Sequence, residues 1–250
     1  MANLSQQDVE RYLDGLFEDA EGNPTQLRLG FAEFVFLIGF LETPESEFSV
    51  RHCGLPERLT ADLLQATGLA SLAARGYVTS EDGDRIELQK EARLLAFVAG
   101  RATTWVQGAL STQGDAAKYP FLIHRYKEIE LMSICGPYAS FNVVPIDPEE
   151  GGAVAALIDT ISAQLEDADG GSVEFSVYHD MQGEPEQVAV SRGATEGEFT
   201  VRRFTGSESP SGSEGEQLSI EAFEELLLDV VGDASAIDDI GAEQADSANQ

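Results

Sequence analysis

The sequence predicts an α+β fold in which N-terminal helices precede two similar modules, each made of an antiparallel β-meander and a helix. Apolar residues recur with a helical period up to about residue 100, and the period then changes to about two, with TTWVQGAL alternating loosely and FLIHRY following as a further predicted strand. The order of meander followed by helix also occurs twice at similar length, which is the sequence signature of an internal repeat. Two such modules commonly pack about a pseudo-two-fold axis, with both helices on one face of a shared sheet.

Four helices are expected before the first module, from the spacing of apolar residues and from the proline and glycine residues that end each run. They cover residues 4–19, 25–41, 59–75 and 86–99. The stretch ESEFSVRHCGLP, residues 45–56, is predicted to be a linker, and SEDGD, residues 80–84, to be a turn. We therefore expect N-terminal helices over residues 1–48 and one α+β domain over residues 49–231.

The two modules are expected over about residues 103–167 and 172–231 of that domain. Strands TTWVQGAL, FLIHRY, EIELMSIC and SFNVVPI precede a helix that begins with Asp147 as the cap and Pro148 in the first helical position. Strands GSVEFSVYHD, EQVAVSRG and EFTVRRFTG precede a last helix over residues 218–231. The Ser- and Gly-rich loop SESPSGSEGEQ is expected to be flexible, and the acidic residues 232–250 to form a disordered tail.

The charge of the chain argues against nucleic acid and anionic membranes as partners. Fifteen Lys and Arg residues stand against 45 Asp and Glu residues, which gives a net charge of −30, whereas binding to phosphate groups needs clustered basic residues. The best apolar run, FAEFVFLIGFL at residues 31–41, is shorter than the roughly 20 residues that span a bilayer. With no apolar N-terminal signal in view, we expect a cytoplasmic protein.

The stretch HRYKEIELMSIC, residues 124–135, contains residue types used in catalysis but is better interpreted as two strands. A turn near Lys127 and Glu128 would place His124 beside Leu131 and away from Cys135, and a general base must lie about 3 Å from its nucleophile. The histidines are scattered and no CxxC pair occurs, so we expect reduced thiols and no metal. No catalytic residue, cofactor or metal ligand is predicted.

The order and spacing of several segments resemble the EspG family of type VII secretion chaperones. These segments are LASLAARGYV, EARLLAFVAG, PFLIHRY, IELMSI, FNVVPID and AVAALI, followed by SVEFSVYHD and the hairpin VAVSRGATEGEFTVRRF, and together they span Leu59 to Val231. The resemblance implies a non-enzymatic chaperone that binds the helical tip of a secretion substrate and keeps it soluble. The chain is more acidic than the family pattern, and the helices before Phe48 match it poorly.

Candidate partner-binding residues are expected on the sheet and in the loop over residues 207–216: Trp105, Arg125, Tyr126, Glu208, Glu214 and Glu216. The partner would be a helical protein client or another protein, and the oligomeric state is left open. One alternative is a structural or regulatory interaction domain that forms a single tight complex. A second alternative is an enzyme whose site is gathered from distant segments, for example Cys53 with His179.

Overall fold

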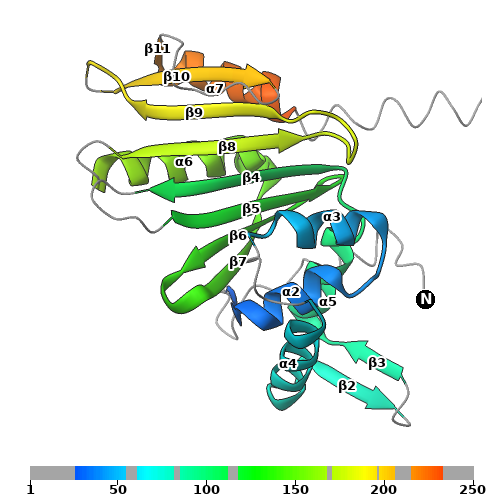
Figure 1. The fold of residues 1–250 in the computed structure, drawn as a ribbon. Helices are drawn as coiled ribbons and strands as arrows, with labels where there is room; N and C mark the ends of the chain where they lie inside the picture. The colour runs from blue at the N-terminus through cyan, green and yellow to red at the C-terminus, as the bar shows by residue number, and fades with distance from the viewer. Residues whose placement is uncertain are drawn as a thin grey trace, which may run out of the picture. The chain divides into compact units, whose positions relative to one another are not determined.

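The computed structural model describes residues 26–54, 61–81, 85–111, 118–167, 171–195, 197–205 and 215–232 (Figure 1). It confirms the α+β class. The chain forms two compact units, of which the first comprises Met1–Ala102 with Ser133–Pro145 and the second Thr103–Met132 with Ile146–Gln250. The expected helix at residues 4–19, most of the loop at 207–216 and the tail from residue 233 lie outside the described residues.

The first unit contains four α-helices in its described residues. Its elements are β1 (Leu27–Gly30), α2 (Phe31–Gly39), α3 (Pro44–His52), α4 (Ala61–Ala74), β2 (Val78–Glu81), β3 (Arg85–Leu88), α5 (Lys90–Ala99) and most of β7 (Ser140–Ile146), which pairs antiparallel with β1. The strand β6 (Ile129–Gly136) contributes its residues from Ser133 onward to this unit. A short 3-10 turn at Pro137–Ala139 links β6 to β7.

Three predictions in this unit are wrong in detail. The helix expected at residues 25–41 begins only at Phe31, because Leu27–Gly30 extends into strand β1. The expected linker at 45–56 is largely helix α3, which Thr43 caps by accepting a hydrogen bond from the Ser46 amide at 3.2 Å. The helix expected at 86–99 begins at Lys90, because residues 85–88 form β3 and pair with β2.

Helices α2 and α4 approach closely at a glycine. Residues Phe34, Leu37 and Ile38 of α2 are buried. A Cβ atom on Gly68 of α4 would lie 2.2 Å from the Ala32 carbonyl oxygen, so only glycine fits this crossing. Glu33 of α2 accepts hydrogen bonds of 2.6 Å from Ser71 of α4 and from Arg75, the residue that follows α4. The buried carboxylate of Glu33 is thereby satisfied.

The second unit is built on antiparallel strands in a mirrored order. Its elements are β4 (Thr104–Ser111), β5 (Lys118–Tyr126), the first residues of β6, α6 (Gly152–Asp167), β8 (Ser172–Tyr178), β9 (Glu186–Arg192), β10 (Glu198–Thr205), β11 (Glu216–Ser219) and α7 (Ile220–Val231). The strands follow the order β6-β5-β4-β8-β9-β10-β11. The central pair β4–β8 is thus flanked on each side by a hairpin, β5–β6 or β9–β10, as a pseudo-two-fold arrangement requires.

The two helices of the second unit pack against each other and cover one face of its strands (Figure 1). As expected, Asp147 is a cap with Pro148 in the first position after it, and its side chain accepts a hydrogen bond from the Glu149 amide. The capped segment is a 3-10 turn at Pro148–Glu150, however, and α6 begins only at Gly152. The last helix begins at Ile220 and not at 218, because residues 216–219 pair with β10 as strand β11. Ser219 caps α7 through the Ala222 amide.

Alternation along the strands separates an apolar face from a polar one. The face toward α6 and α7 carries the buried side chains Val173, Phe175, Val177, Val188, Val190, Phe199 and Val201. The opposite face of β8, β9 and β10 carries Ser172, Glu174, Ser176, Gln187, Ala189, Ser191, Thr200 and Arg202. No helix of the second unit covers this second face in the described part of the chain, and we call it the open face.

The apolar face is tightest at Gly108 of β4, which lies opposite Phe121 of β5 and Phe175 of β8. A Cβ atom on Gly108 would lie 2.2 Å from Cζ of Phe121 and 2.9 Å from Cβ of Phe175. Gly108→Ala is expected to lower the free energy of unfolding by about 1–3 kcal/mol because the ring must shift in a packed core. Urea unfolding measures this, with Ala109→Ser on the opposite face as the control, and an equally stable Gly108→Ala variant would contradict it.

Candidate functional site on the open face

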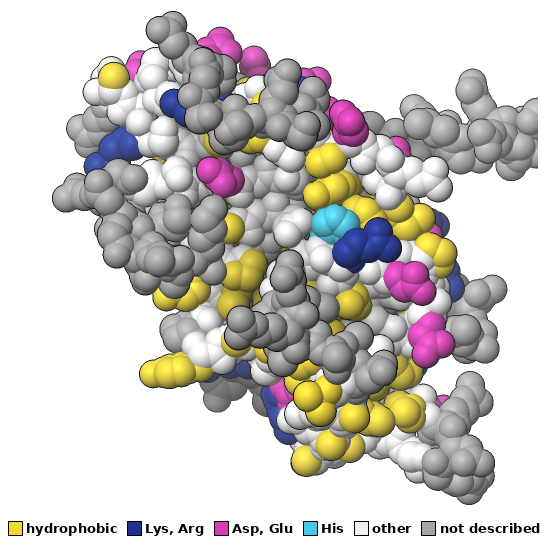
Figure 2. Space-filling view, viewed as in Figure 1, with side chains coloured by type: hydrophobic (Ala, Val, Ile, Leu, Met, Phe, Trp, Pro, Cys, Tyr) yellow, Lys and Arg dark blue, Asp and Glu magenta, His cyan; other side chains and the backbone are white. Residues whose placement is uncertain are grey.

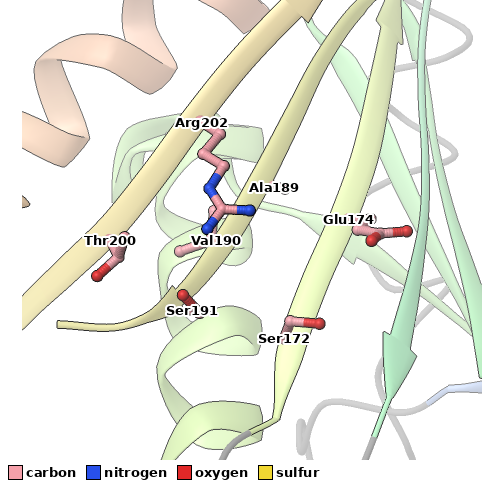
Figure 3. A pocket seen from close by; sticks show the side chains of 7 residues that line it. All are labelled: Ser172, Glu174, Ala189, Val190, Ser191, Thr200 and Arg202. Carbon is pink, nitrogen blue, oxygen red and sulfur yellow. The ribbon is translucent and has the colours of Figure 1, made fainter. Parts of the chain in front are cut away.

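The open face contains a shallow hollow across β8, β9 and β10 (Figure 3). Its volume is about 200 Å³. Two rows of cross-strand neighbours line it, Glu174, Ala189 and Arg202 in one row and Ser172, Ser191 and Thr200 in the next. Ala189 has only a methyl group, so the floor of the hollow is low between the long side chains of Glu174 and Arg202. The Arg202 guanidinium lies over β9 in Figure 3.

Hydrogen bonds fix one side of this hollow. The Gln217 side chain on β11 donates to the Thr200 hydroxyl at 2.6 Å and accepts from the Ala194 amide at 3.1 Å. The Thr200 hydroxyl in turn donates to the Arg192 carbonyl oxygen at 3.3 Å. These contacts tie β11 to the β9–β10 hairpin and hold the hydroxyl row in place.

The hollow offers hydroxyl groups, a guanidinium and a carboxylate. In Figure 2 the surface that is not grey over β8, β9 and β10 is white with scattered acidic, basic and apolar side chains, and no large apolar patch gathers there. Small-molecule sites usually enclose about 300–1,000 Å³, so a hollow of this size takes a side chain or a short stretch of backbone. Its chemistry suits polar contacts with another protein surface.

Two of the residues predicted to bind a partner are inside the protein. The exposed fraction is 2% for Trp105 and 3% for Arg125, so neither presents its side chain to a partner in this structure. Tyr126 is half-buried at the end of β5, and Glu216 is exposed on the edge strand β11. Glu208 and Glu214 lie outside the described residues.

Arg125 is buried because it has a structural role. Its Nε atom donates to Oε1 of Glu130, and its Nη1 atom donates to the carbonyl oxygens of Val231 at 2.8 Å and Gly232 at 3.1 Å. Glu130 also accepts a hydrogen bond of 2.6 Å from the Ala153 amide. The Arg125 cation therefore lies at the C-terminal end of α7, and the Glu130 anion lies at the N-terminal end of α6. Both positions are the ones that the helix dipoles favour.

The residues considered for catalysis do not form a catalytic arrangement within their own units. In the second unit, the two ring nitrogens of His124 have no hydrogen-bond partner among the described residues, and burial lowers the pKa of His124 to about 4. In the first unit, burial raises the pKa of the Cys135 thiol, which reduces its thiolate fraction. Cys53 is buried and donates to the Val50 carbonyl oxygen, and His179 bonds the Val230 carbonyl oxygen at 2.8 Å.

The described part of the chain contains neither a metal-binding cluster nor a membrane-spanning helix. No group of three or more His, Cys, Asp or Glu side chains in the described ranges is placed to bind a metal. No helix within these ranges is both long and apolar enough to span a bilayer.

The residues of the hollow were not among those predicted, although the sequence carries a signal for them. In SVEFSVY, QVAVSR and FTVRRF the residues between the buried apolar positions are mainly Ser, Ala, Glu and Arg. Period-2 alternation therefore identifies an exposed polar face. Which of its residues become cross-strand neighbours depends on the register, which the sequence does not state.

Comparison of the sequence with protein-family models and with curated proteins gave no match.

Proposed function

We propose that this chain is a non-enzymatic protein-binding protein that holds a protein client on its open face, as a chaperone for type VII secretion substrates. The observation that carries the proposal is the mirrored arrangement of the second unit, whose helices cover one face of the strands while the other face stays polar and hollowed. An antiparallel sheet needs only one buried face to be stable. The second face is therefore available for binding.

The chemistry of the open face supports a protein as the ligand. Hydroxyl groups from Ser172, Ser191 and Thr200 can donate and accept hydrogen bonds, so they can pair with the polar side chains or the backbone of a client. Glu174 and Arg202 add charges of both signs. Mixed polar groups of this kind mainly determine the orientation and the specificity of an interface, and they add less to its affinity.

The class of client rests on the resemblance to the EspG family, which covers Leu59 to Val231. The repeated order of strands and a helix, on which the resemblance partly rests, recurs as β4–β7 with α6 and as β8–β11 with α7. In that family the client presents a helical tip. We accordingly propose a helical secretion substrate as the client, with the cytoplasm as the place of binding.

The test is affinity purification of the tagged full chain from its native host, with mass spectrometry of the proteins that co-elute. We expect a small helical secretion substrate in stoichiometric amount. Ser191→Arg places a long charged side chain in the hollow and is expected to reduce recovery of the client about tenfold, as a change at the centre of an interface does. Thr67→Arg, on the exposed surface of α4, adds the same side chain in the other unit and serves as the control.

Both variants should keep the far-UV circular dichroism and urea midpoint of the unmodified protein, since both positions lie at the surface or half-buried. Equal recovery with Ser191→Arg and with the unmodified chain would remove the open face from the proposal. A single stoichiometric partner that is not a secretion substrate would support the regulatory alternative instead. Recovery of no partner by any of the three proteins would contradict the binding function.

A further inference from the structure

The turn at the end of the β6–β7 hairpin presents a tyrosine side chain to solvent (Figure 1). Tyr138 has a relative exposure of 103%, the largest among the exposed apolar side chains of the described residues, and Leu63 follows at 62%. The ring therefore adds no packing to the fold. Single exposed apolar residues are common on protein surfaces, so the exposure of Tyr138 acquires a meaning only together with the backbone and the charge around it.

The backbone of this turn is unfavourable for the residues that it contains. Tyr138 has φ 62° and ψ 29°, and Ala139 has φ 53°. Both residues lie in the left-handed region, which is strained for most side chains, and turns with two successive residues of positive φ usually contain Asn and Gly there. The chain thus has a less stable turn and gains no packing from the Tyr138 ring in return. Strained residues of this kind cluster at functional sites.

The hairpin around the turn carries no charge. Residues 131–146, LMSICGPYASFNVVPI, contain no Asp, Glu, Lys, Arg or His, although 24% of the residues of the chain are charged and its net charge is −30. The centre of a protein–protein interface is depleted of charged residues and enriched in tyrosine and other aromatic residues. An uncharged hairpin that ends in an exposed tyrosine has this composition.

The turn is attached to a well-packed part of the first unit. Strand β7 pairs with β1 from Ser140 onward, directly after the turn. Phe141 is fully buried and stacks on Phe34 of α2 with ring centroids 4.1 Å apart, and Val143 is fully buried as well. The backbone of the turn is therefore held in place, and binding would order little more than the Tyr138 side chain, which has few rotatable bonds.

We propose that Tyr138 anchors a contact with a protein partner, whose surface receives the ring in an apolar pocket. A convex turn fits a concave surface, and tyrosine offers a flat apolar ring with a hydroxyl group that can bond at the rim of the pocket. Tyrosine is also frequent among the few residues that dominate binding energy. A second copy of the chain is disfavoured, because both copies would carry a charge of −30. A lipid surface is disfavoured, because a single ring buries little apolar area and the charge repels anionic lipids.

This contact goes beyond the client binding proposed for the open face. Tyr138 belongs to the first unit, whereas Ser172, Ser191 and Thr200 of the hollow belong to the second. Ser191→Arg changes the hollow and leaves the turn intact, and a substitution of Tyr138 does the reverse. Either proposal can therefore fail while the other stands.

The first experiment is site-specific photo-crosslinking of the full chain in its native host. Tyr138→p-benzoyl-phenylalanine keeps an aromatic ring at the turn, and we expect one adduct with one other protein that forms only on irradiation and is identified by mass spectrometry. Leu63→p-benzoyl-phenylalanine, at an exposed position of α4 in the same unit, is the control and should not form this adduct. The proposal fails if position 138 gives no adduct, the same adduct as position 63, or an adduct only with lipid or with a second copy of the chain.

The second experiment measures the Kd between the full chain and the purified protein of that adduct by calorimetry. Tyr138→Asn with Ala139→Gly should weaken binding at least about tenfold, because it removes the anchoring ring. The same double variant should have a higher urea midpoint than the unmodified chain, because Asn and Gly suit the left-handed backbone of the turn. Loss of binding together with a gain in stability is the result that a purely structural tyrosine would not give.

Two single variants separate the ring from the turn. Tyr138→Phe keeps the ring and should leave the Kd within about threefold to tenfold, because it loses one hydrogen bond at most. Ala139→Gly relieves the backbone but keeps Tyr138, so it should raise the urea midpoint and leave the Kd within about threefold. An unchanged Kd in the double variant would overturn the proposal. A lower urea midpoint in that variant would overturn it as well, because Tyr138 would then stabilise the fold.

Discussion

Replacing Glu130 with alanine is expected to lower the free energy of unfolding by about 3–5 kcal/mol, because it leaves the Arg125 charge buried without its partner. Both side chains are at most 3% exposed. The same change removes the acceptor for the Ala153 amide at the start of α6, which adds an unsatisfied donor. Urea unfolding followed by circular dichroism measures the loss.

Two comparisons show whether the effect comes from the buried charge. The double variant Arg125→Met, Glu130→Leu removes both charges and should recover part of the loss, because a paired ion and its apolar replacement often have similar net stability. Arg203→Ala breaks the exposed ion pairs of Arg203 with Glu186 and Asp229 and should cost no more than about 1 kcal/mol. A Glu130→Ala variant that loses as little as Arg203→Ala would refute the structural role of the network.

His124 is expected to make the protein less stable in acid. The residue is completely buried in β5, and burial lowers its pKa from 6.5 to about 4. Between pH 6.5 and pH 4 the unfolded chain therefore binds a proton that the folded protein does not, so stability is full above pH 6.5 and falls as the pH drops toward 4. The loss over that window is about 3 kcal/mol, at about 1.4 kcal/mol for each pH unit.

Many carboxylates also titrate in this range, so the contribution of His124 is measured as a difference between variants. His124→Leu should flatten the dependence of the unfolding free energy on pH between 6.5 and 4 by about 3 kcal/mol. Leu122→Ile alters a buried position on the same side of β5 without changing a titratable group, and should keep the original slope. The assignment fails if His124→Leu and Leu122→Ile have the same slope.

The elements of the second half of the chain could be predicted well from the sequence, because its strands are long and are bounded by clear turn and cap residues. At least five alternating residues in VEFSVY and in EFTVRRF distinguish a strand from a helix. Asp147 and Ser219 cap the helical segments that follow them, as their side chains favour. The repeated order of elements also appears in the mirrored strand order about β4 and β8.

The first half was less predictable, because its strands are short. Four residues such as LRLG or RIEL fit a helical and an alternating pattern equally well. Helix α3 has a polar sequence, so its apolar periodicity is weak, and the cap at Thr43 with Pro44 was the stronger signal. A proline also commonly follows the end of a helix, so the same residues fit the end of the helix expected at 25–41 as well as the start of α3.

Most of the candidate site could not be predicted from the sequence, because it depends on contacts between residues that are far apart along the chain. Arg125 in an alternating strand suggests a surface position, and its partners at Val231 and Gly232 lie in a different part of the chain. The hollow similarly depends on which residue of β9 lies between Glu174 and Arg202. Both groupings follow from register and packing, which local patterns do not determine.

The central position of the β4–β8 pair has a consequence for synthesis of the protein on the ribosome. The hairpins β5–β6 and β9–β10 join neighbouring strands, but β4 must wait for β8, which is translated only after β5, β6, β7 and α6. During that interval one edge of β4 exposes unpaired backbone groups, and such an edge is a template for pairing between nascent chains. The arrival of residues 172–178 closes this edge and joins the two halves of the second unit.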